Sequence, residues 1–387
     1  MRKAFKFKLY NSKQNKELEN QLHCAARTYN HFLALSKRYY RIFKKSLSCY
    51  RMQKHLTKLK KLEKFNWLRQ LNSQTSQDIT ERIQKGYDKF FSDLKNKKKT
   101  SPPKFKAKRR YKSFTLKQTG YKLLDGNKVK IGKRVFKFFK SREIEGKIKT
   151  LTIKRDTVGD WFLVFSCELD TSQQKVRVRT GKSAGFDFGL KCFLTDHDGN
   201  KIESPLFLKN SMKELKKKSR YLSRKRRGSN NRRKARLDLA RLHIKVQNQR
   251  RDFHFKLGKE LAEEYDAMFF EDLTLKGMSR LWGRKMSDLG FGEFMIILDY
   301  QARKCGAVVH KIDKWYPSSQ TCSACLKKRE TRLKLSDRTW TCSCGASHDR
   351  DHNAAKNIFR EGASSLGLCG IKTSYKLAAS NSRIPRL

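Results

Sequence analysis

The sequence predicts an α+β protein built from several domains. Apolar and polar residues alternate near the N-terminus and through much of residues 114–167, which indicates half-buried strands. Apolar residues instead recur at helical spacing across residues 14–97 and 211–260. With 387 residues, the chain is long enough for two or three domains.

The charge of the chain indicates a polyanionic partner. Lys and Arg total 92 against 36 Asp and Glu, which gives a net charge of +56 spread from end to end. A compact chain of this charge repels itself unless a polyanion neutralises it, and nucleic acid is the natural candidate. A membrane protein is not expected, because no apolar run approaches the roughly 20 residues that span a bilayer. Lys residues interrupt the N-terminal segment, which therefore does not resemble a signal peptide.

The first part of the chain is predicted to be a small β-barrel interrupted by helices. A strand containing Phe5, Phe7 and Leu9 precedes the helical block of residues 14–97. Short strands separated by turn residues follow between residues 114 and 167. We expect the N-terminal strand to complete the barrel, so that residues 1–13 and 98–175 form one domain around the helical insert.

Two basic stretches are candidates for contact with nucleic acid. In the first, cationic residues alternate with Phe105, Tyr111 and Phe114, so that cations could hold phosphates while aromatic faces accept bases. The second surrounds the break Gly228–Asn231 between two predicted helices. A solvated charge run is the alternative for the first stretch. The candidate nucleic-acid-binding residues are Lys104, Lys106, Arg109, Arg110, Arg224, Arg226, Arg227, Arg232 and Arg233.

The second part of the chain alternates short apolar strands with helices. After a polar linker, the predicted elements are a hairpin of two strands over residues 184–195 and 201–203, two long helices over 211–260, a buried strand over 267–273, a loop over 277–292, a helix from 294 to 305, a strand over 307–312 and a helix after Asn353. Residues 362–387 are rich in Ser and are expected to be a disordered tail.

Two acidic residues, Asp187 and Glu271, lie within or at the end of these apolar strands. A buried carboxylate without a partner costs several kcal/mol, so each needs a cation or strong donors nearby. For Asp187, a hydrogen bond to a turn is the structural alternative. A third acid, Asp351, or its neighbour Asp349, stands at the start of the last predicted helix.

Two cysteine pairs lie just before this helix. Cys322 and Cys325 are separated by sixteen residues from Cys342 and Cys344. Thiolates in two tight turns are suited to hold one tetrahedral Zn²⁺, and a closed site of four sulfurs is structural. The second pair has the spacing C-x-C where C-x-x-C is commoner, which leaves His348 as a reserve ligand. Two chance pairs of free cysteines are the alternative. The remaining cysteines, which suit a reducing cytoplasm, are Cys24, Cys49, Cys167, Cys192, Cys305 and Cys369.

Asp187, Glu271 and Asp351 lie about 80 residues apart along the chain. If they meet, they repel each other, and divalent cations resolve the repulsion. Carboxylate oxygens suit Mg²⁺ or Mn²⁺, and two such ions can activate a water and stabilise the leaving oxygen of a phosphodiester. The sequence contains no phosphate-binding GxxxxGK[ST] motif and no Ser-His-Asp arrangement with an elbow motif that competes with this hypothesis.

Several of these segments together resemble the signature blocks of the TnpB family, the transposon-encoded RNA-guided DNA nucleases. The similarity extends over nearly the whole chain to about residue 361. The segments that carry it are Phe186–Leu190, Phe270–Leu273, Tyr316–Cys322 and Asp349–Ile358, with weaker resemblance at Pro103–Arg110 and Asn248–Phe253.

The resemblance implies a β-barrel wedge domain with a helical recognition insert. It also implies a RuvC-like nuclease domain of RNase H fold over residues 176–316 and 346–361, with an inserted zinc ribbon over 317–345. By this resemblance, the catalytic acids are expected to be Asp187, Glu271 and Asp351, with Asp351 favoured over Asp349. The expected cofactors are structural Zn²⁺ and catalytic Mg²⁺ or Mn²⁺, and the expected partners are a guide RNA and double-stranded target DNA.

The predicted function is therefore an RNA-guided DNA endonuclease of a transposon, acting in the cytoplasm as a monomer bound to RNA. It would cut target DNA next to a short flanking motif by metal-dependent hydrolysis. A RuvC-like nuclease that works without a guide is one alternative. A catalytically inactive zinc-ribbon protein that binds nucleic acid as a repressor is the other.

Overall fold

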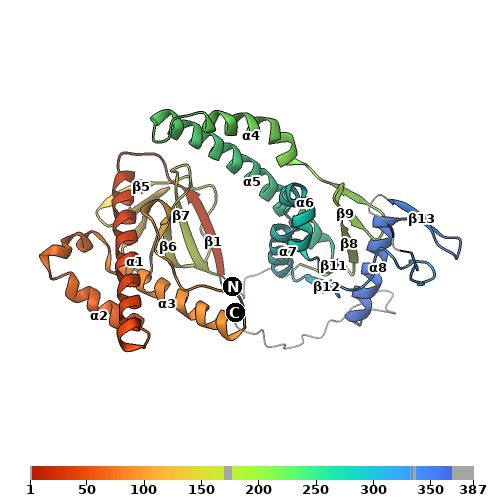
Figure 1. The fold of residues 1–387 in the computed structure, drawn as a ribbon, viewed down its shortest axis with the longest axis horizontal. Coiled ribbons are helices and arrows are strands. Elements are labelled where there is room, and N and C mark those ends of the chain that lie inside the picture. The colour runs from red at the N-terminus through yellow and green to blue at the C-terminus, as the bar shows by residue number, and fades with distance from the viewer. Residues whose placement is uncertain (1, 170–176, 332, 334–336, 368–387) are drawn as a thin grey trace. The chain divides into compact units, whose positions relative to one another are not determined.

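The computed structural model describes residues 2–169, 177–331, 333 and 337–367. The chain divides into two compact units, Met1–Gln174 and Lys175–Leu387, whose elements are labelled in Figure 1.

The first unit is built on two antiparallel sheets, one of four strands in the order β1-β7-β6-β2 and one of three strands in the order β3-β4-β5. An isolated bridge between Leu9 and Phe138 links the two sheets. The predicted N-terminal strand is confirmed, and it pairs with β7. Closure into a barrel stays a prediction. The strands are β1 (Arg2–Lys8), β2 (Ser113–Leu116), β3 (Tyr121–Leu124), β4 (Lys128–Ile131), β5 (Arg134–Lys137), β6 (Lys147–Arg155) and β7 (Trp161–Glu168).

Helices between β1 and β2 share a hydrophobic core with the sheets. Phe5 and Phe165 of the larger sheet lie in the same buried cluster as Phe32 of α1 and Ile79 of α3. The Asn72 side chain caps α3 by accepting a hydrogen bond from the Gln74 N–H. The helical elements are α1 (Asn15–Phe43), α2 (Cys49–Leu59), α3 (Ser73–Lys95) and the short 3₁₀ segments η1 (Glu63–Gln70) and η2 (Lys108–Arg110).

The second unit contains a mixed five-stranded sheet in the order β10-β9-β8-β11-β12. Strands β10, β9 and β8 are antiparallel neighbours, whereas β8, β11 and β12 run parallel to one another. A separate hairpin, β13-β14, belongs to the cysteine region. The strands are β8 (Ser183–Phe188), β9 (Cys192–Asp196), β10 (Lys201–Glu203), β11 (Ala267–Glu271), β12 (Val308–Ile312), β13 (Thr339–Thr341) and β14 (Ser347–Asp349).

Helices α5 and α7 contribute to one core against this sheet, and α8 contributes to another. Gly306, in the left-handed region with φ of 76°, ends α7 as predicted. The predicted pair of long helices is confirmed as α4 and α5, with Ser229 capping α5. The helices are α4 (Phe207–Ser223), α5 (Asn230–Glu264), α6 (Leu275–Leu289), α7 (Phe291–Cys305) and α8 (Arg350–Ser365).

Three local predictions were wrong. Residues 277–292 contain helix α6 and not a loop, because Met286 and Leu289 are buried in the core at helical spacing. The run from Ala184 to Thr195 is two strands, β8 and β9, with a turn between them. Helix α8 continues past Gly362 to Ser365, so the predicted tail starts too early. The remainder of that tail, residues 368–387, lies outside the described residues.

Candidate active site and cysteine cluster

Asp187 and Glu271 lie beside each other at one edge of the sheet. Strands β8 and β11 are parallel, with Phe186 opposite Phe270, so the next residue of each strand is an acid. Parallel strands end at the same edge, which is where side chains from separate loops and helices can converge. The two predicted acids are therefore brought together by strand register.

Helix α8 brings the third acid to the same edge, because small residues allow it to pack very close to the sheet. A Cβ atom at Gly185 of β8 would collide with the backbone nitrogen of Phe359, and one at Gly362 of α8 would collide with the Phe269 ring of β11. Asp351 lies in the first turn of this helix. The close packing therefore fixes its position relative to the strands that carry Asp187 and Glu271.

The two aspartates at the start of α8 have different surroundings. Asp349 is the N-cap: its Oδ1 accepts hydrogen bonds from the N–H groups of Asp351 and His352, both at 3.0 Å. Its Oδ2 pairs with Lys201 Nζ at 2.9 Å. Partial burial raises the pKa of Asp349, but these hydrogen bonds outweigh it and hold the pKa below its usual value. Asp351 instead faces a cavity, and its Oδ2 lies 3.5 Å from Arg338 Nη1.

Asp187, Glu271 and Asp351 all line one cavity of about 830 Å³. Cationic and aromatic side chains form much of the remaining wall, and these contributors are Trp282, Lys314, Trp315, Tyr316, Lys328, Arg338 and Arg350. A negatively charged polymer with planar bases matches this lining, since cations attract phosphates and aromatic faces stack on bases.

The electrostatics of the cavity favour a bound cation. Burial, and then the nearby carboxylates of Asp351 and Glu271, raise the pKa of Asp187 well above its usual value, although Arg350 opposes this. Burial also raises the pKa of Glu271. A divalent cation among these acids would offset both the burial and the mutual repulsion. Hard carboxylate oxygens fit Mg²⁺ or Mn²⁺.

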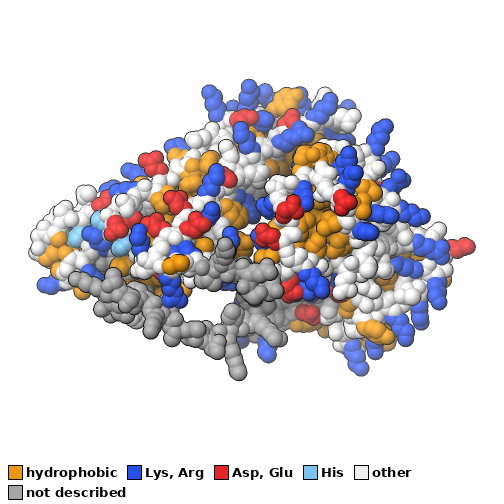
Figure 2. Space-filling model, turned by 180° about the vertical axis from the view of Figure 1, so that it is seen from behind, with side chains coloured by type: hydrophobic (Ala, Val, Ile, Leu, Met, Phe, Trp, Pro, Cys, Tyr) orange, Lys and Arg blue, Asp and Glu red, His pale blue; other side chains and the backbone are white. Residues whose placement is uncertain are grey.

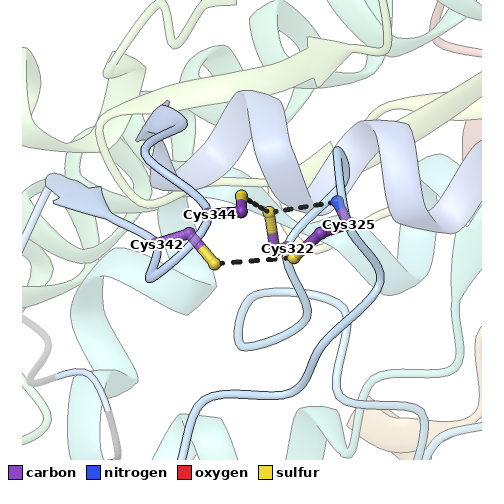
Figure 3. A group of neighbouring side chains, drawn as sticks. All are labelled: Cys322, Cys325, Cys342 and Cys344. Atoms are coloured by element: carbon purple, nitrogen blue, oxygen red, sulfur yellow. Dashed lines mark hydrogen bonds between the residues drawn. The ribbon is translucent and has the colours of Figure 1, made fainter.

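The four predicted cysteines form a tighter group. The sulfur atoms of Cys322, Cys325, Cys342 and Cys344 all lie within 4.8 Å of one another, and Figure 3 shows the side chains converging from two loops. Cys322 and Cys344 approach to 3.8 Å, and Cys325 and Cys342 to 3.6 Å. A hydrogen bond from the Cys344 backbone lowers the pKa of Cys342 to about 6. Four sulfurs at these separations fit a tetrahedral Zn²⁺.

Cys344 belongs to this group despite the C-x-C spacing, and His348 lies next to it. His348 Nε2 is 3.1 Å from Cys322 Sγ. Among the described residues, the cysteines are the set whose donor atoms meet closely enough to surround one ion. The three carboxylates share a cavity but do not form so compact a set.

The candidate nucleic-acid-binding residues differ in how far their side chains are available. Figure 2 shows Lys and Arg side chains spread over the visible surface. Arg224, Arg226, Arg227 and Arg233 are exposed around the turn between α4 and α5. Arg232 instead donates hydrogen bonds from Nη1 to the backbone oxygens of Leu222 and Lys225, both at 2.9 Å, and so closes that turn.

In the first unit, Lys104, Lys106, Arg109 and Arg110 are all exposed. Lys106 lies near aromatic faces, with Nζ 4.8 Å from the centre of the Tyr29 ring. Its backbone exchanges hydrogen bonds with the Asn30 side chain at 2.9 Å each. Burial, followed by nearby Arg82, lowers the pKa of Lys106. These contacts with Tyr29 and Asn30 hold the basic segment of residues 104–110 against α1.

Sequence reasoning missed several residues of the cavity wall. Trp315 is 79% exposed, and its neighbour Lys314 lies over its ring at 4.2 Å. A tryptophan in a polar loop just before the Tyr316 motif was the available signal. Trp282 lay in the segment predicted to be a loop, and its place depends on how α6 packs. No helix in the described part of the chain is both long and apolar enough to cross a membrane.

Comparison with known families gives three matches along the chain. Residues 165–281 match a family described as a probable transposase, OrfB_IS605. Residues 291–358 match the Cas12f1-like TNB domain, and residues 1–45 match a helix-turn-helix domain.

Individual relatives extend over more of the chain. A protein from Streptomyces pristinaespiralis named "Putative RNA-guided DNA endonuclease" is 30% identical over 378 residues, covering 96% of this chain and 91% of the relative. TnpB-like protein L79 of Acanthamoeba polyphaga mimivirus is 29% identical over 232 residues, covering 55% of this chain and 43% of that protein.

A solved structure shows that the fold itself is shared. The protein in a structure of the Cas12f1-sgRNA-target DNA complex superposes with a TM-score of 0.56 at 14% identity, covering 90% of this chain and 83% of that one. Because a relative is 30% identical over 96% of this chain and residues 165–281 match the OrfB_IS605 transposase family, this chain belongs to the TnpB family.

Proposed function

We propose that this protein is an RNA-guided DNA endonuclease of a transposon. The observation that carries the proposal is the convergence of Asp187, Glu271 and Asp351 on one cavity from β8, β11 and α8. The name of the Streptomyces relative supports the same activity. The cationic and aromatic wall of the cavity supports a nucleic-acid substrate.

The nuclease domain is proposed to be RuvC-like, over residues 176–316 and 346–361. A mixed sheet with antiparallel β10, β9 and β8 followed by parallel β11 and β12 is what an RNase H fold requires. The zinc ribbon would cover residues 317–345, which contain all four cysteines. Residues 1–13 and 98–175 would be the wedge domain, and residues 14–97 the recognition domain.

Asp187, Glu271 and Asp351 would hold Mg²⁺ or Mn²⁺ for phosphodiester hydrolysis. Bound there, the ions would supply an activated water and charge neutralisation at the leaving oxygen. The acids must be ionised to do this, so the raised pKa of Asp187 must fall when cations bind. Arg338, 3.5 Å from Asp351, and Lys328 would orient the phosphate in the cavity.

A guide RNA is proposed to neutralise much of the net charge of +56. The RNA would select the target strand by base pairing, while the protein reads a short flanking motif in double-stranded DNA. We expect a monomer bound to RNA that acts in the cytoplasm.

The test is to purify the protein, sequence the RNA that copurifies and measure Mg²⁺-dependent DNA cutting. One dominant RNA species that directs cutting to a complementary target supports the proposal. Cutting that persists after the RNA is removed favours the nuclease that works without a guide. Sequence-specific binding without cutting by any RNA-bound preparation favours the repressor.

A further inference from the structure

A second cavity, of about 710 Å³, lies directly beside the one that holds the acids. It is formed by the turn after β8, the first turns of α4 and helix α6. Leu190 and Trp282 line both cavities, so these two side chains form a shared wall. Nothing in the proposed catalytic mechanism uses this second space.

Trp282 is the aromatic side chain in that wall. The backbone at Trp282 departs from helical geometry, with φ of −124° and ψ of 35°, and this kinks α6. The residue packs against the hydrophobic core of the second unit and stays half-buried. An indole that packs against a core and also lines a cavity is suited to stack on a nucleotide base.

Cations surround the apolar part of this second cavity. Lys191, Lys209, Arg284 and Lys285 line it and are exposed, and none of them forms an ion pair within the described part of the chain. The acid in the wall, Asp288, offsets only part of this charge: it is one carboxylate against four cations, and it accepts hydrogen bonds from the backbone N–H groups of Leu208 and Lys209, at 2.7 and 3.0 Å. The lining thus combines an aromatic side chain with an excess of positive charge.

We propose that this second cavity binds the single-stranded DNA that enters the catalytic cavity, with one base stacked on Trp282 and the adjoining phosphates against Lys209 and Arg284. The inference rests on the proposed endonuclease activity and adds a substrate-binding subsite to it. A DNA strand matches the lining better than a small apolar molecule does, since only an anionic ligand gains from the four exposed cations. The shared wall places the stacked nucleotide next to Asp187 and Glu271.

Photochemical cross-linking tests the subsite without requiring cutting. The full RNA-bound protein is irradiated with a single-stranded DNA oligonucleotide that carries 5-iododeoxyuridine, which reacts with aromatic side chains in contact with the base. We expect an adduct on Trp282, identified by peptide mass spectrometry, that unlabelled DNA competes away. Adducts confined to Trp315 or other residues would overturn the proposal. So would preferential labelling of Trp282 by an RNA oligonucleotide of the same sequence.

The second measurement is the KM and kcat of cutting with single-stranded DNA as the substrate. Lys209→Glu combined with Arg284→Glu should raise KM for single-stranded DNA about tenfold with little change in kcat, because the cations that hold the phosphates are removed while the acids are untouched. The backbone N–H of Lys209 still bonds Asp288 in this variant. Lys304→Glu, an exposed charge reversal at the end of α7, should leave KM unchanged.

Substitutions of the tryptophan separate stacking from packing. Trp282→Ala should raise KM at least about fivefold, and Trp282→Phe should restore most of the loss, because stacking on a base needs only an aromatic face. If the wild-type protein cuts DNA and neither the charge nor the tryptophan variants change KM, the subsite is wrong. If the wild-type protein cuts no DNA but Trp282 still cross-links, the endonuclease proposal fails and the DNA-binding subsite stands.

Discussion

Asn357 in α8 donates a hydrogen bond from Nδ2 to the backbone oxygen of Thr321 at 2.6 Å. The same amide donates to the backbone oxygen of Ser318 at 2.8 Å. One turn earlier, the Asn353 side chain accepts from the Ser323 N–H at 2.9 Å. Both asparagines are buried. They join the helix that begins beside the cavity lined by the three acids to the loop that carries Cys322.

The first prediction concerns this connection. Asn357→Ala removes one of the two amide donors from the backbone oxygens of Ser318 and Thr321 and leaves only Asn353 to bond them, which should destabilise the second unit by about 1–3 kcal/mol. DNA cutting should fall as well, because Asp351 lies on the same helix. Thermal unfolding and cleavage rates check the two effects. Lys356→Ala, which changes an exposed neighbour on the same helix, should alter neither, and equal behaviour of the two variants would contradict the role given to Asn357.

The second prediction separates the two aspartates at the start of α8. Asp351→Ala should abolish cutting while RNA and DNA binding survive, since metal-dependent sites lose orders of magnitude when a ligand is removed. Asp349→Ala removes an N-cap and should cost about 1 kcal/mol of stability while much of the cutting is retained. Cleavage assays and unfolding curves on both variants measure this. Loss of cutting with Asp349→Ala alone would reverse the assignment.

Local pattern predicted much of this architecture, because strand alternation and helical spacing are properties of short segments. For that reason the sequence could single out Asp187 and Glu271 as candidates, since each is an acid in or at the end of an apolar strand. The local pattern could not decide between Asp349 and Asp351, because that choice depends on which carboxylate caps the helix. Helix α6 was missed because Gly277, Gly283 and Trp282 mark a loop locally, whereas tertiary packing of Met286 and Leu289 stabilises the helix. The cavity beside Trp282 depends on that packing.

The third prediction is one tightly bound Zn²⁺ per chain. The Cys322→Ser variant should lose the metal, unfold at a lower temperature and lose DNA cutting. The reason is that the cysteine region has little hydrophobic core of its own and depends on the metal to fold. Elemental analysis and unfolding with and without a chelator measure these effects. Cys305→Ser, at a half-buried cysteine outside the cluster, should retain the zinc. Active wild-type protein without zinc would refute the assignment.

The fourth prediction is a pH-dependent stability that arises from His254. Burial lowers its pKa to about 4, although a hydrogen bond to the Leu289 backbone oxygen opposes this. The unfolded chain, with a pKa near 6.5, binds the proton first as pH falls. The stabilisation is therefore complete above about pH 6.5 and is lost progressively towards pH 4, by about 1–3 kcal/mol.

Denaturant unfolding at pH 7 and pH 5 measures this dependence. His254→Gln should show a smaller decrease in stability between the two values than the wild-type protein does. His243→Gln, at an exposed position on the same helix, should keep the wild-type decrease. If the His254 variant and the wild-type protein lose the same free energy, the imidazole does not carry the effect.

The fifth prediction concerns the turn between α4 and α5, where neighbouring arginines have different surroundings. Arg226, Arg227 and Arg233 are exposed, so their replacement by Glu should weaken nucleic-acid binding and leave the unfolding temperature unchanged. The slope of log K against log salt should fall by about 0.7–0.9 for each phosphate that the variant no longer neutralises.

Arg232→Ala supplies the contrasting variant. Its guanidinium holds two backbone oxygens at the turn, so its removal should destabilise the end of the α4–α5 hairpin. The two effects are measured by binding titrations across salt concentrations and by amide hydrogen exchange over residues 220–236. Faster exchange should appear for Arg232→Ala and not for the exposed triple variant. If the triple variant binds nucleic acid with an unchanged salt slope, the exposed arginines do not contact phosphate. In that case the charge of the hairpin is only a solvated face, and the RNA must be held elsewhere on the protein.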